Sequence, residues 1–138
     1  MQLELDALLH RVREIGVADS SIERLPALAT GSATGVFLNP PNDGAAHVEV
    51  WVGDAGWHVT VAEFFSREFP PADSRLAAEL VLLCISTGVC VVSDRGRRWF
   101  VTGRQSSHSG DVVVRSCPAW TGAKLSQSVR SEIRWRMQ

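Results

Sequence analysis

A short polar stretch contains the residue types of a nucleophilic triad. Hydroxyls, an imidazole and a carboxylate come from Ser106, Ser107, His108, Ser109 and Asp111. In such a triad the imidazole takes a proton from serine while the carboxylate orients the ring, and rigid supports must hold all three groups. A glycine- and serine-rich loop lacks those supports, and no Gly-x-Ser-x-Gly motif is present. The stretch therefore predicts a solvated loop, and we expect a protein that is not an enzyme.

A second set of polar residues lies on two predicted strands. The alternation in residues 47–52 places Glu49 and Trp51 on the face opposite the valines, and a hairpin turn at 53–56 brings Trp51 near His58. Glu49 and His58 could serve as an acid/base pair or as part of a binding surface. An exposed tryptophan ring leaves on the order of 150–250 Å² of surface uncovered. We expect a partner to cover Glu49, Trp51 and His58; the plainer interpretation is a solvated sheet face with one amphipathic tryptophan.

Two further tryptophans lie next to arginines. Arg97 stands in a turn before Trp99, a combination that suits phosphate, nucleic-acid bases or a protein interface. Trp135 lies between two arginines, off the apolar stripe of a predicted final helix. We add Arg97 and Trp135 to the expected partner-binding residues. For Arg97 the alternative is a structural turn with Trp99 in the core. For Trp135 the alternative is a homodimer contact.

Metal and cofactor motifs are missing from the sequence. No paired cysteine or histidine spacing of a zinc site occurs, and the glycines of residues 31–35 are not followed by a phosphate-binding lysine. Cys84 and Cys90 fall in apolar segments, whereas Cys117 precedes a proline and is expected to be the most reachable thiol. We therefore expect no metal and no cofactor.

The elements that position these residues follow from periodicity and turn signals. Apolar residues recur at helical spacing near both ends of the chain and in its middle, and strand-like alternation fills the two intervals between. The predicted helices are 3–15, 74–87 and 122–137, and the predicted strands are 35–39, 47–52, 57–65, 89–92, 98–102 and 111–115. The sequence thus predicts an α+β fold in the order α-βββ-α-βββ-α, with helices on one face of an antiparallel sheet of five or six strands.

Length and composition limit the class of protein. The chain has 138 residues, of which 45% are hydrophobic and 21% are charged. This composition excludes general disorder and favours a single domain over residues 1–138. No apolar run reaches membrane-spanning length, and charged residues interrupt the first segment, so neither a membrane anchor nor a signal peptide is expected. The chain has three cysteines, an odd number, and their spacing matches no disulfide framework. This fits reduced thiols, and we expect a cytoplasmic protein.

Charge is divided unequally along the chain. Residues 1–87 hold 12 acidic and 5 basic residues, whereas residues 88–138 hold 3 acidic and 9 basic ones, and the net charge is −1. The acidic part could face a cationic partner, unless folding interleaves the two parts and cancels the field. A near-neutral chain disfavours nucleic acid as the partner. Arginine supplies all but one of the 14 basic residues, as in GC-rich bacterial coding sequences.

The predicted element order resembles the small α/β fold of type III secretion chaperones. The resemblance covers most of the chain, rests on element order alone, and implies a bacterial protein that binds another protein. Immunity proteins, which neutralise a cognate toxin, also work by surface complementarity. An immunity protein or secretion chaperone is therefore our leading hypothesis. The alternatives are a small-molecule-binding domain or minor enzyme with a pocket between sheet and helices, using His58 or His108, and a nucleic-acid binder using Arg95, Arg97, Arg98 and Arg104.

Overall fold

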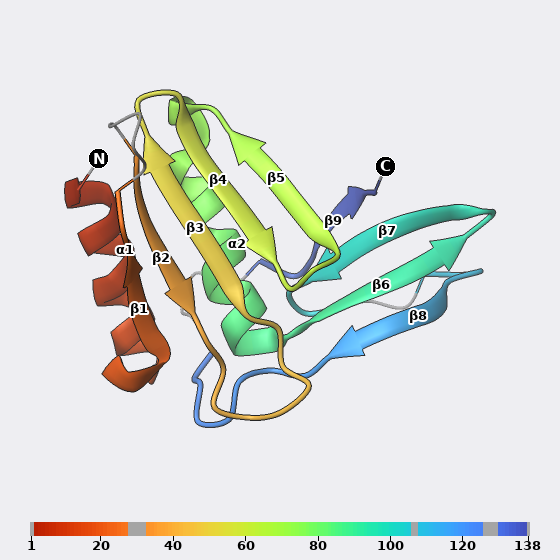
Figure 1. Cartoon of the computed structure of the whole chain (residues 1–138). Helices are drawn as coiled ribbons and strands as arrows, with labels where there is room; N and C mark the ends of the chain where they lie inside the picture. Colours follow the sequence, from red (N-terminus) through yellow and green to blue (C-terminus); the bar gives the residue numbers. More distant parts are fainter. Residues whose placement is uncertain (1, 28–32, 106–107, 126–129, 138) are drawn as a thin grey trace.

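The computed structural model describes residues 2–27, 33–105, 108–125 and 130–137. Within these residues, two helices and two antiparallel sheets make up the fold, which confirms the α+β class (Figure 1). The elements are α1 (Gln2–Glu14), β1 (Ile22–Leu25), β2 (Thr34–Leu38), β3 (Val48–Gly53), β4 (Gly56–Val61), β5 (Phe65–Phe69), α2 (Ser74–Thr87), β6 (Val89–Asp94), β7 (Arg97–Thr102), β8 (Val112–Cys117) and β9 (Ile133–Arg136). Single 3₁₀ turns, Asp19–Ser21 and Pro71–Asp73, precede β1 and α2.

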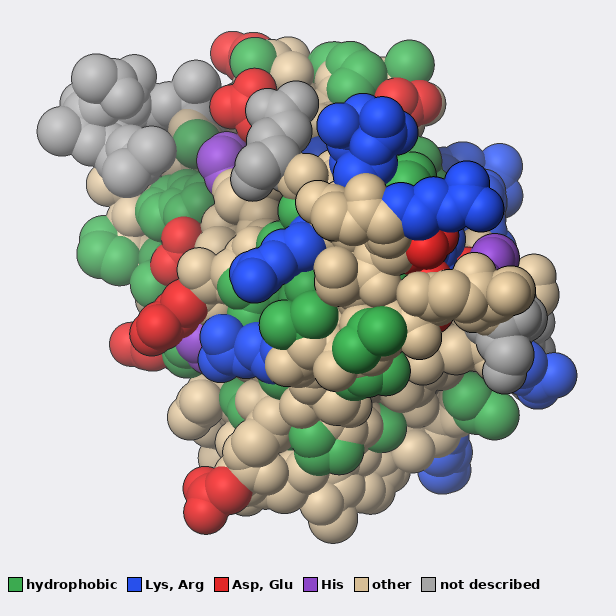
Figure 2. Space-filling model, turned by 90° about the vertical axis from the view of Figure 1, so that its right-hand side faces the viewer, with side chains coloured by type: hydrophobic (Ala, Val, Ile, Leu, Met, Phe, Trp, Pro, Cys, Tyr) green, Lys and Arg blue, Asp and Glu red, His purple; other side chains and the backbone are tan. Residues whose placement is uncertain are grey.

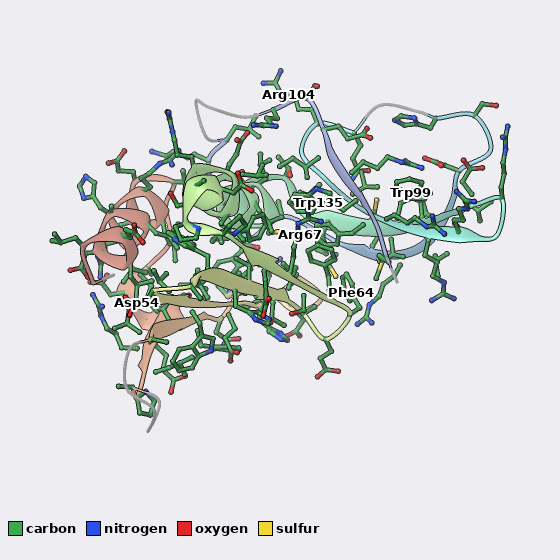
Figure 3. All side chains as sticks on the ribbon, turned by 90° about the horizontal axis from the view of Figure 1, so that it is seen from above. Asp54, Phe64, Arg67, Trp99, Arg104 and Trp135 are labelled. Atoms are coloured by element: carbon green, nitrogen blue, oxygen red, sulfur yellow. The ribbon has the colours of Figure 1, made fainter. Side chains whose placement is uncertain are left out.

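The first sheet contains residues 22–69 in the strand order β1-β2-β3-β4-β5. Strand alternation directs one set of side chains, including Val50, Val59 and Trp57, into the core. Both helices cover this inner face, and none of the described helices or strands lies over the opposite face (Figures 1 and 3). Helices on one face of an antiparallel sheet were predicted, and the first sheet has this arrangement.

The helices are held by burial of their apolar residues. Leu5, Leu8 and Leu9 of α1 face the sheet, and α2 is buried over almost its whole circumference from Ala77 to Ser86. The chain turns sharply after α2 at Gly88, whose φ is +78° and where an added Cβ would lie 2.5 Å from a backbone oxygen. Within the described residues, neither helix provides an apolar stretch of the length needed to cross a membrane.

The second sheet contains residues 89–136 in the strand order β8-β6-β7-β9. Its inner face joins the same hydrophobic core as the first sheet, chiefly through Phe100, which is fully buried. The ring of Phe100 stacks on Phe65 of the first sheet with 3.9 Å between centroids. One apolar core thus links both sheets and α2.

The single sheet of five or six strands is replaced by separate sheets of five and four strands. The physical reason is α2, which carries the chain away from the first sheet, so that the strands after Gly88 pair only with one another. The run 57–65 also divides at Ala62 into β4 and β5, because this residue adopts a positive φ of 50°. The strand Ile22–Leu25 was not predicted.

The predicted final helix, 122–137, is wrong where the structure describes it. Ile133–Arg136 forms β9 and pairs with β7, and residues 122–125 are not helical. Residues 126–129 of that prediction lie outside the described residues. Pairing with the edge of β7 buries Ile133 and also packs Trp135, which lay off the apolar stripe of the predicted helix, against the core. The chaperone-like element order therefore lacks its last helix in the described residues.

Candidate functional site

The outer face of the first sheet is the candidate site, and we call it the open face. The strand register places Gly35, Trp51, His58 and Glu68 in one row across β2 to β5. A second row of outward positions runs beside it. Its members are Glu23, Phe37, Glu49, Thr60 and Ser66. The register confirms the predicted pairing of Trp51 with His58 and of Glu49 with Thr60.

Trp51 lies flat over its neighbour on β2. The residue opposite it is Gly35, and a Cβ added there would come within 2.6 Å of the indole ring. The glycine therefore gives the ring a place to lie on the sheet, where the ring is half-buried. The indole Nε1 donates a hydrogen bond to Glu49 Oε2 at 3.1 Å, which fixes the ring orientation. The ring of Trp51 is therefore already ordered, and a contact made to it would cost little further side-chain entropy.

His58 is also held by its neighbours on the open face. One ring nitrogen is hydrogen-bonded to the Ser66 hydroxyl, and the other lies 3.7 Å from Glu68 Oε1. Beside these residues is a surface hollow of about 570 Å³, lined in part by Trp51, Asp54 and Glu68. An aromatic ring and carboxylates around one hollow suit a positively charged group.

Charge on the open face has one sign among the described residues. Its ionised side chains are Glu23, Glu49 and Glu68, and no lysine or arginine occupies an outward position of β1 to β5. Arg24 points to the inner side, where it binds Asp6 of α1 at 2.8 Å. In Figure 2, Lys and Arg side chains gather over the second sheet, and carboxylates follow the left margin, where the open face is seen from its edge. The unequal charge along the chain is thus also unequal in space, because each sheet is built from one part of the sequence.

Trp135 does not join the open face. It lies on β9 between the two sheets, half-buried, with its ring parallel to that of Phe65 at 5.7 Å. The Arg67 guanidinium covers the ring at 4.5 Å (Figure 3). The prediction of an exposed tryptophan on a final helix is therefore wrong for Trp135. The residue lies on a strand, and side chains of the same chain already cover much of its ring.

Arg97 is exposed and lies on the second sheet, whereas Trp51 lies on the first. It begins β7 next to the β6–β7 turn and pairs with Asp94 in the register of the second sheet. Its neighbour Trp99 lies on the sheet face away from the main core, packed on a small cluster of Cys90, Val92 and Val101. The structure thus brings together Glu49, Trp51 and His58, and leaves Arg97 and Trp135 elsewhere.

The described residues of the polar loop, 103–105 and 108–111, make two contacts on this same face of the second sheet. Asp111 accepts two hydrogen bonds from the Arg134 guanidinium, each 2.8 Å long. His108 lies 3.0 Å from Glu132, so its ring already has a carboxylate neighbour. The hydrogen bonds from Arg134 lower the pKa of Asp111 below its ordinary value. Of the residues expected to be a solvated loop, Ser106 and Ser107 lie outside the described residues.

The three cysteines are buried and reduced. Loss of water around the sulfur raises the pKa of Cys84 and of Cys90, which disfavours the nucleophilic thiolate. Cys117 was expected to be the most reachable, but it is also buried, because the chain around Pro118 folds back onto the start of β6. No cluster of possible metal ligands is found among the residues that the structure describes.

Sequence reasoning placed Glu49, Trp51, His58 and Thr60 on this face and missed its other members, of which Phe37, Glu68 and Glu23 matter most; Glu23 was missed because β1 was not predicted. Phe37 shares its strand with two buried residues, Val36 and Leu38, so the alternation within 35–39 carried the signal for an outward ring. Glu68 belongs to β5, which was not separated from β4, and no alternation of residue type marks its outward position.

The fold and the site together define a class: an α+β protein of two antiparallel sheets with an uncovered aromatic and acidic sheet face. Searches of protein-family models, of curated proteins and of solved structures find no significant match to this chain.

Proposed function

We propose that this protein is a non-catalytic binding module whose open face docks onto a cationic surface of another protein. The observation that carries the proposal is the open face itself, where Trp51 and Phe37 lie among three glutamates, with no cation at an outward position of the described strands β1 to β5. Bacterial immunity proteins that neutralise a toxin and secretion chaperones are the two classes that would use such a surface.

The two components of the open face have different energetic roles. Half-buried aromatic rings retain apolar area that a partner can remove from water, at about 25 cal/mol per Å². Glu49 and Glu68 provide long-range attraction, which speeds encounter with a basic partner and excludes acidic ones. Trp51 is therefore the expected energetic centre, and the glutamates determine which partners reach it.

The proposal is tested by capture of the partner from cells that encode this chain. We expect one stoichiometric, basic protein with the wild-type bait, and its loss with Trp51→Ala. Glu49→Lys should also lose it, whereas Glu4→Lys, an equal change of charge at an exposed site on α1, should retain it. Equal capture by wild-type protein, Trp51→Ala and Glu49→Lys overturns the proposal, as does an absence of any stoichiometric protein.

A second candidate function is binding of a small molecule at the second sheet. A hollow of about 320 Å³ lies on its far face, where apolar Cys90 and Val92 meet the polar groups of Gln105, His108 and Arg134. This differs from the predicted pocket between sheet and helices. Thermal-shift screening tests this function, with Val92→Trp as a control in which the hollow is filled. A ligand that stabilises only the wild-type protein would support the function, and an equal response of both proteins would exclude it.

A further inference from the structure

A groove follows the free edge of β5, the last strand of the first sheet. It has a volume of about 570 Å³ and is lined by residues 64–68 together with Arg136 of β9 and its neighbour Met137. Residues from both faces of β5 line it, so the groove runs along the strand edge. Both β5 and β9 are edge strands, and each presents unpaired backbone groups on one side. We call this hollow the edge groove.

Three arginines surround the edge groove. Arg67 and Arg136 line it, and Arg115 lies 4.7 Å from the ring centre of Phe64, which lines it as well. None of these three guanidinium groups forms an ion pair with a described residue. Positive charge is therefore left over at this groove for an anionic ligand.

Ring contacts hold two of these arginines in place. The Arg67 guanidinium lies 4.5 Å from the ring centre of Trp135, and Arg115 packs on Phe64 in the same manner. Figure 3 shows Arg67, Trp135 and Phe64 near one another. A guanidinium packed on a ring still directs its N–H groups sideways, where two of them can bind both oxygens of a carboxylate. Ordered guanidinium groups also lose little further side-chain entropy on binding.

Charge alternates along the edge of β5. Arg67 is opposite the buried Val59 and therefore stands on the inner side of the sheet. Glu68 is turned to the open face, where its Oε1 lies 3.7 Å from His58 Nδ1. Successive residues of an added strand point to opposite faces in the same way. A strand with acidic residues at every second position can direct them all to the side of Arg67 and keep uncharged residues beside Glu68.

We propose that the edge groove binds an extended acidic segment of another protein, which pairs with β5 as an added strand and directs alternate carboxylates to Arg67 and Arg136. Backbone hydrogen bonds to the unpaired side of β5 supply affinity, and the arginines select the acidic pattern. Arg67 at the centre of β5 disfavours pairing with a basic strand. This surface has the opposite charge to the open face and does not depend on the proposed function.

A single-stranded nucleic acid fits the edge groove less well. Its bases stack on uncovered aromatic rings, but guanidinium groups already occupy a face of Trp135 and of Phe64. A nucleic acid also carries a phosphate at every residue, so it cannot keep its negative charge away from Glu68. An acidic peptide is therefore the favoured ligand.

Fluorescence anisotropy with labelled ten-residue peptides tests the proposal on the full chain. The probe alternates glutamate with threonine, and its matched control has the same composition with the glutamates in one block. We expect the alternating peptide to bind at least about fivefold more tightly than the block peptide, because only the alternating peptide keeps its charges from Glu68. A peptide that alternates lysine with threonine and an oligothymidylate of ten nucleotides should both bind more weakly than the alternating acidic peptide.

Variants of the arginines locate the binding site. Arg67→Gln and Arg136→Gln should each raise the dissociation constant of the alternating peptide at least about tenfold. Arg75→Gln removes the same charge from an exposed site on α2 that does not line the groove, and it should bind like wild-type protein. Circular dichroism shows whether each variant is folded. Because Arg67 packs on Trp135, Arg136→Gln decides the result if Arg67→Gln does not fold.

Hydrogen exchange distinguishes strand addition from attraction by charge alone. Slower exchange of the β5 amides with the alternating peptide supports the proposal. Five outcomes overturn it: no binding of this peptide, equal binding of the block peptide, equal or tighter binding of the oligothymidylate, unchanged exchange in β5, or an equal loss with Arg75→Gln. Trp51→Ala should bind the peptide like wild-type protein, and Arg136→Gln should still capture the basic partner. Failure of this proposal and failure of the proposed function are therefore distinguishable.

Discussion

The outer faces of the two sheets hold similar residues but differ in what covers them. On the first sheet, Trp51 and His58 lie among glutamates, and no described helix or strand lies above them. On the second sheet, Trp99 lies beneath the Arg134 guanidinium at 5.0 Å, and Asp111 fastens the polar loop beside it. Both tryptophans are half-buried, and they differ in their neighbours: an arginine of β9 lies over the Trp99 ring, whereas the Trp51 ring lies over Gly35 and is bonded to Glu49.

The comparison extends to charge. The ionised outward residues of the first sheet are all carboxylates, and the strands of the second sheet carry Arg97, Arg98, Arg115, Arg134 and Arg136. Two basic residues of the second part nevertheless reach the first part: Arg115 lies over Phe64, and Arg130 binds Glu79 of α2. Sheets that shared strands from both parts would have mixed these charges. Separate sheets keep the two electrostatic surfaces apart, which is the condition for docking on a charged partner.

The largest expected effect comes from breaking the contact between the two sheets. Phe100→Ala removes the fully buried ring that stacks on Phe65, so it should lower the free energy of unfolding by about 3–5 kcal/mol. Urea unfolding measures the change. Phe37→Ala makes the same truncation on the open face and should cost about 1 kcal/mol. Equal losses would mean that the open face is packed as tightly as the core.

The contact between the Trp51 ring and Gly35 can be tested by adding a side chain at Gly35. Gly35→Val places a side chain against the indole ring, which should cost about 1–3 kcal/mol of unfolding free energy. In a Trp51→Ala background the same change should be nearly neutral, because the obstructing ring is gone. Chemical unfolding of the four proteins of this cycle gives the coupling. Additive effects would contradict the contact.

Acidification should weaken the interaction between Asp111 and Arg134 on the second sheet. Because the pKa of Asp111 is lowered in the folded protein, its contribution to stability is complete above the ordinary aspartate pKa and is lost as pH falls through the folded value. Wild-type protein should therefore exceed Asp111→Asn in urea midpoint at about pH 7 and by much less at about pH 2.5.

The arginine partner provides the control for this pH effect. When Arg134→Gln is already present, adding Asp111→Asn should change the urea midpoint far less than it does in wild-type protein, because the hydrogen bonds that lower the Asp111 pKa are gone. A pH-dependent effect of Asp111→Asn that persists in the Arg134→Gln background would contradict this assignment.

The smallest expected effect sharpens the distinction between docking and packing. Glu68→Gln removes one charge from the open face at a side chain that is 86% exposed, so the free energy of unfolding should change by less than about 0.5 kcal/mol. Retention of the captured partner should nevertheless fall, most clearly at low salt. A stability loss above about 1 kcal/mol would assign Glu68 a structural role.

Much of the first sheet could be predicted from local pattern. Alternation in residues 47–52 and 57–61 fixes which side chains share a face, and a short turn between them sets the register of Trp51 with His58. The β9 segment could not be predicted in this way, because Ile133 and Met137 fit a helical stripe as well as a strand. Its conformation depends on the unpaired edge of β7, which is formed by residues far earlier in the chain.

The sequence by itself determined the α+β class, the strand faces, the buried central helix and the division of charge along the chain. These features depend on residue periodicity and on turn residues close in sequence. Only the tertiary structure decided that the strands form two sheets, that Trp135 is covered by Arg67 while Trp51 remains on an uncovered face, and that β8 lies at an edge. Each of these outcomes depends on which segments, distant in sequence, pack against a given surface. Local residue patterns carry no information about such long-range contacts.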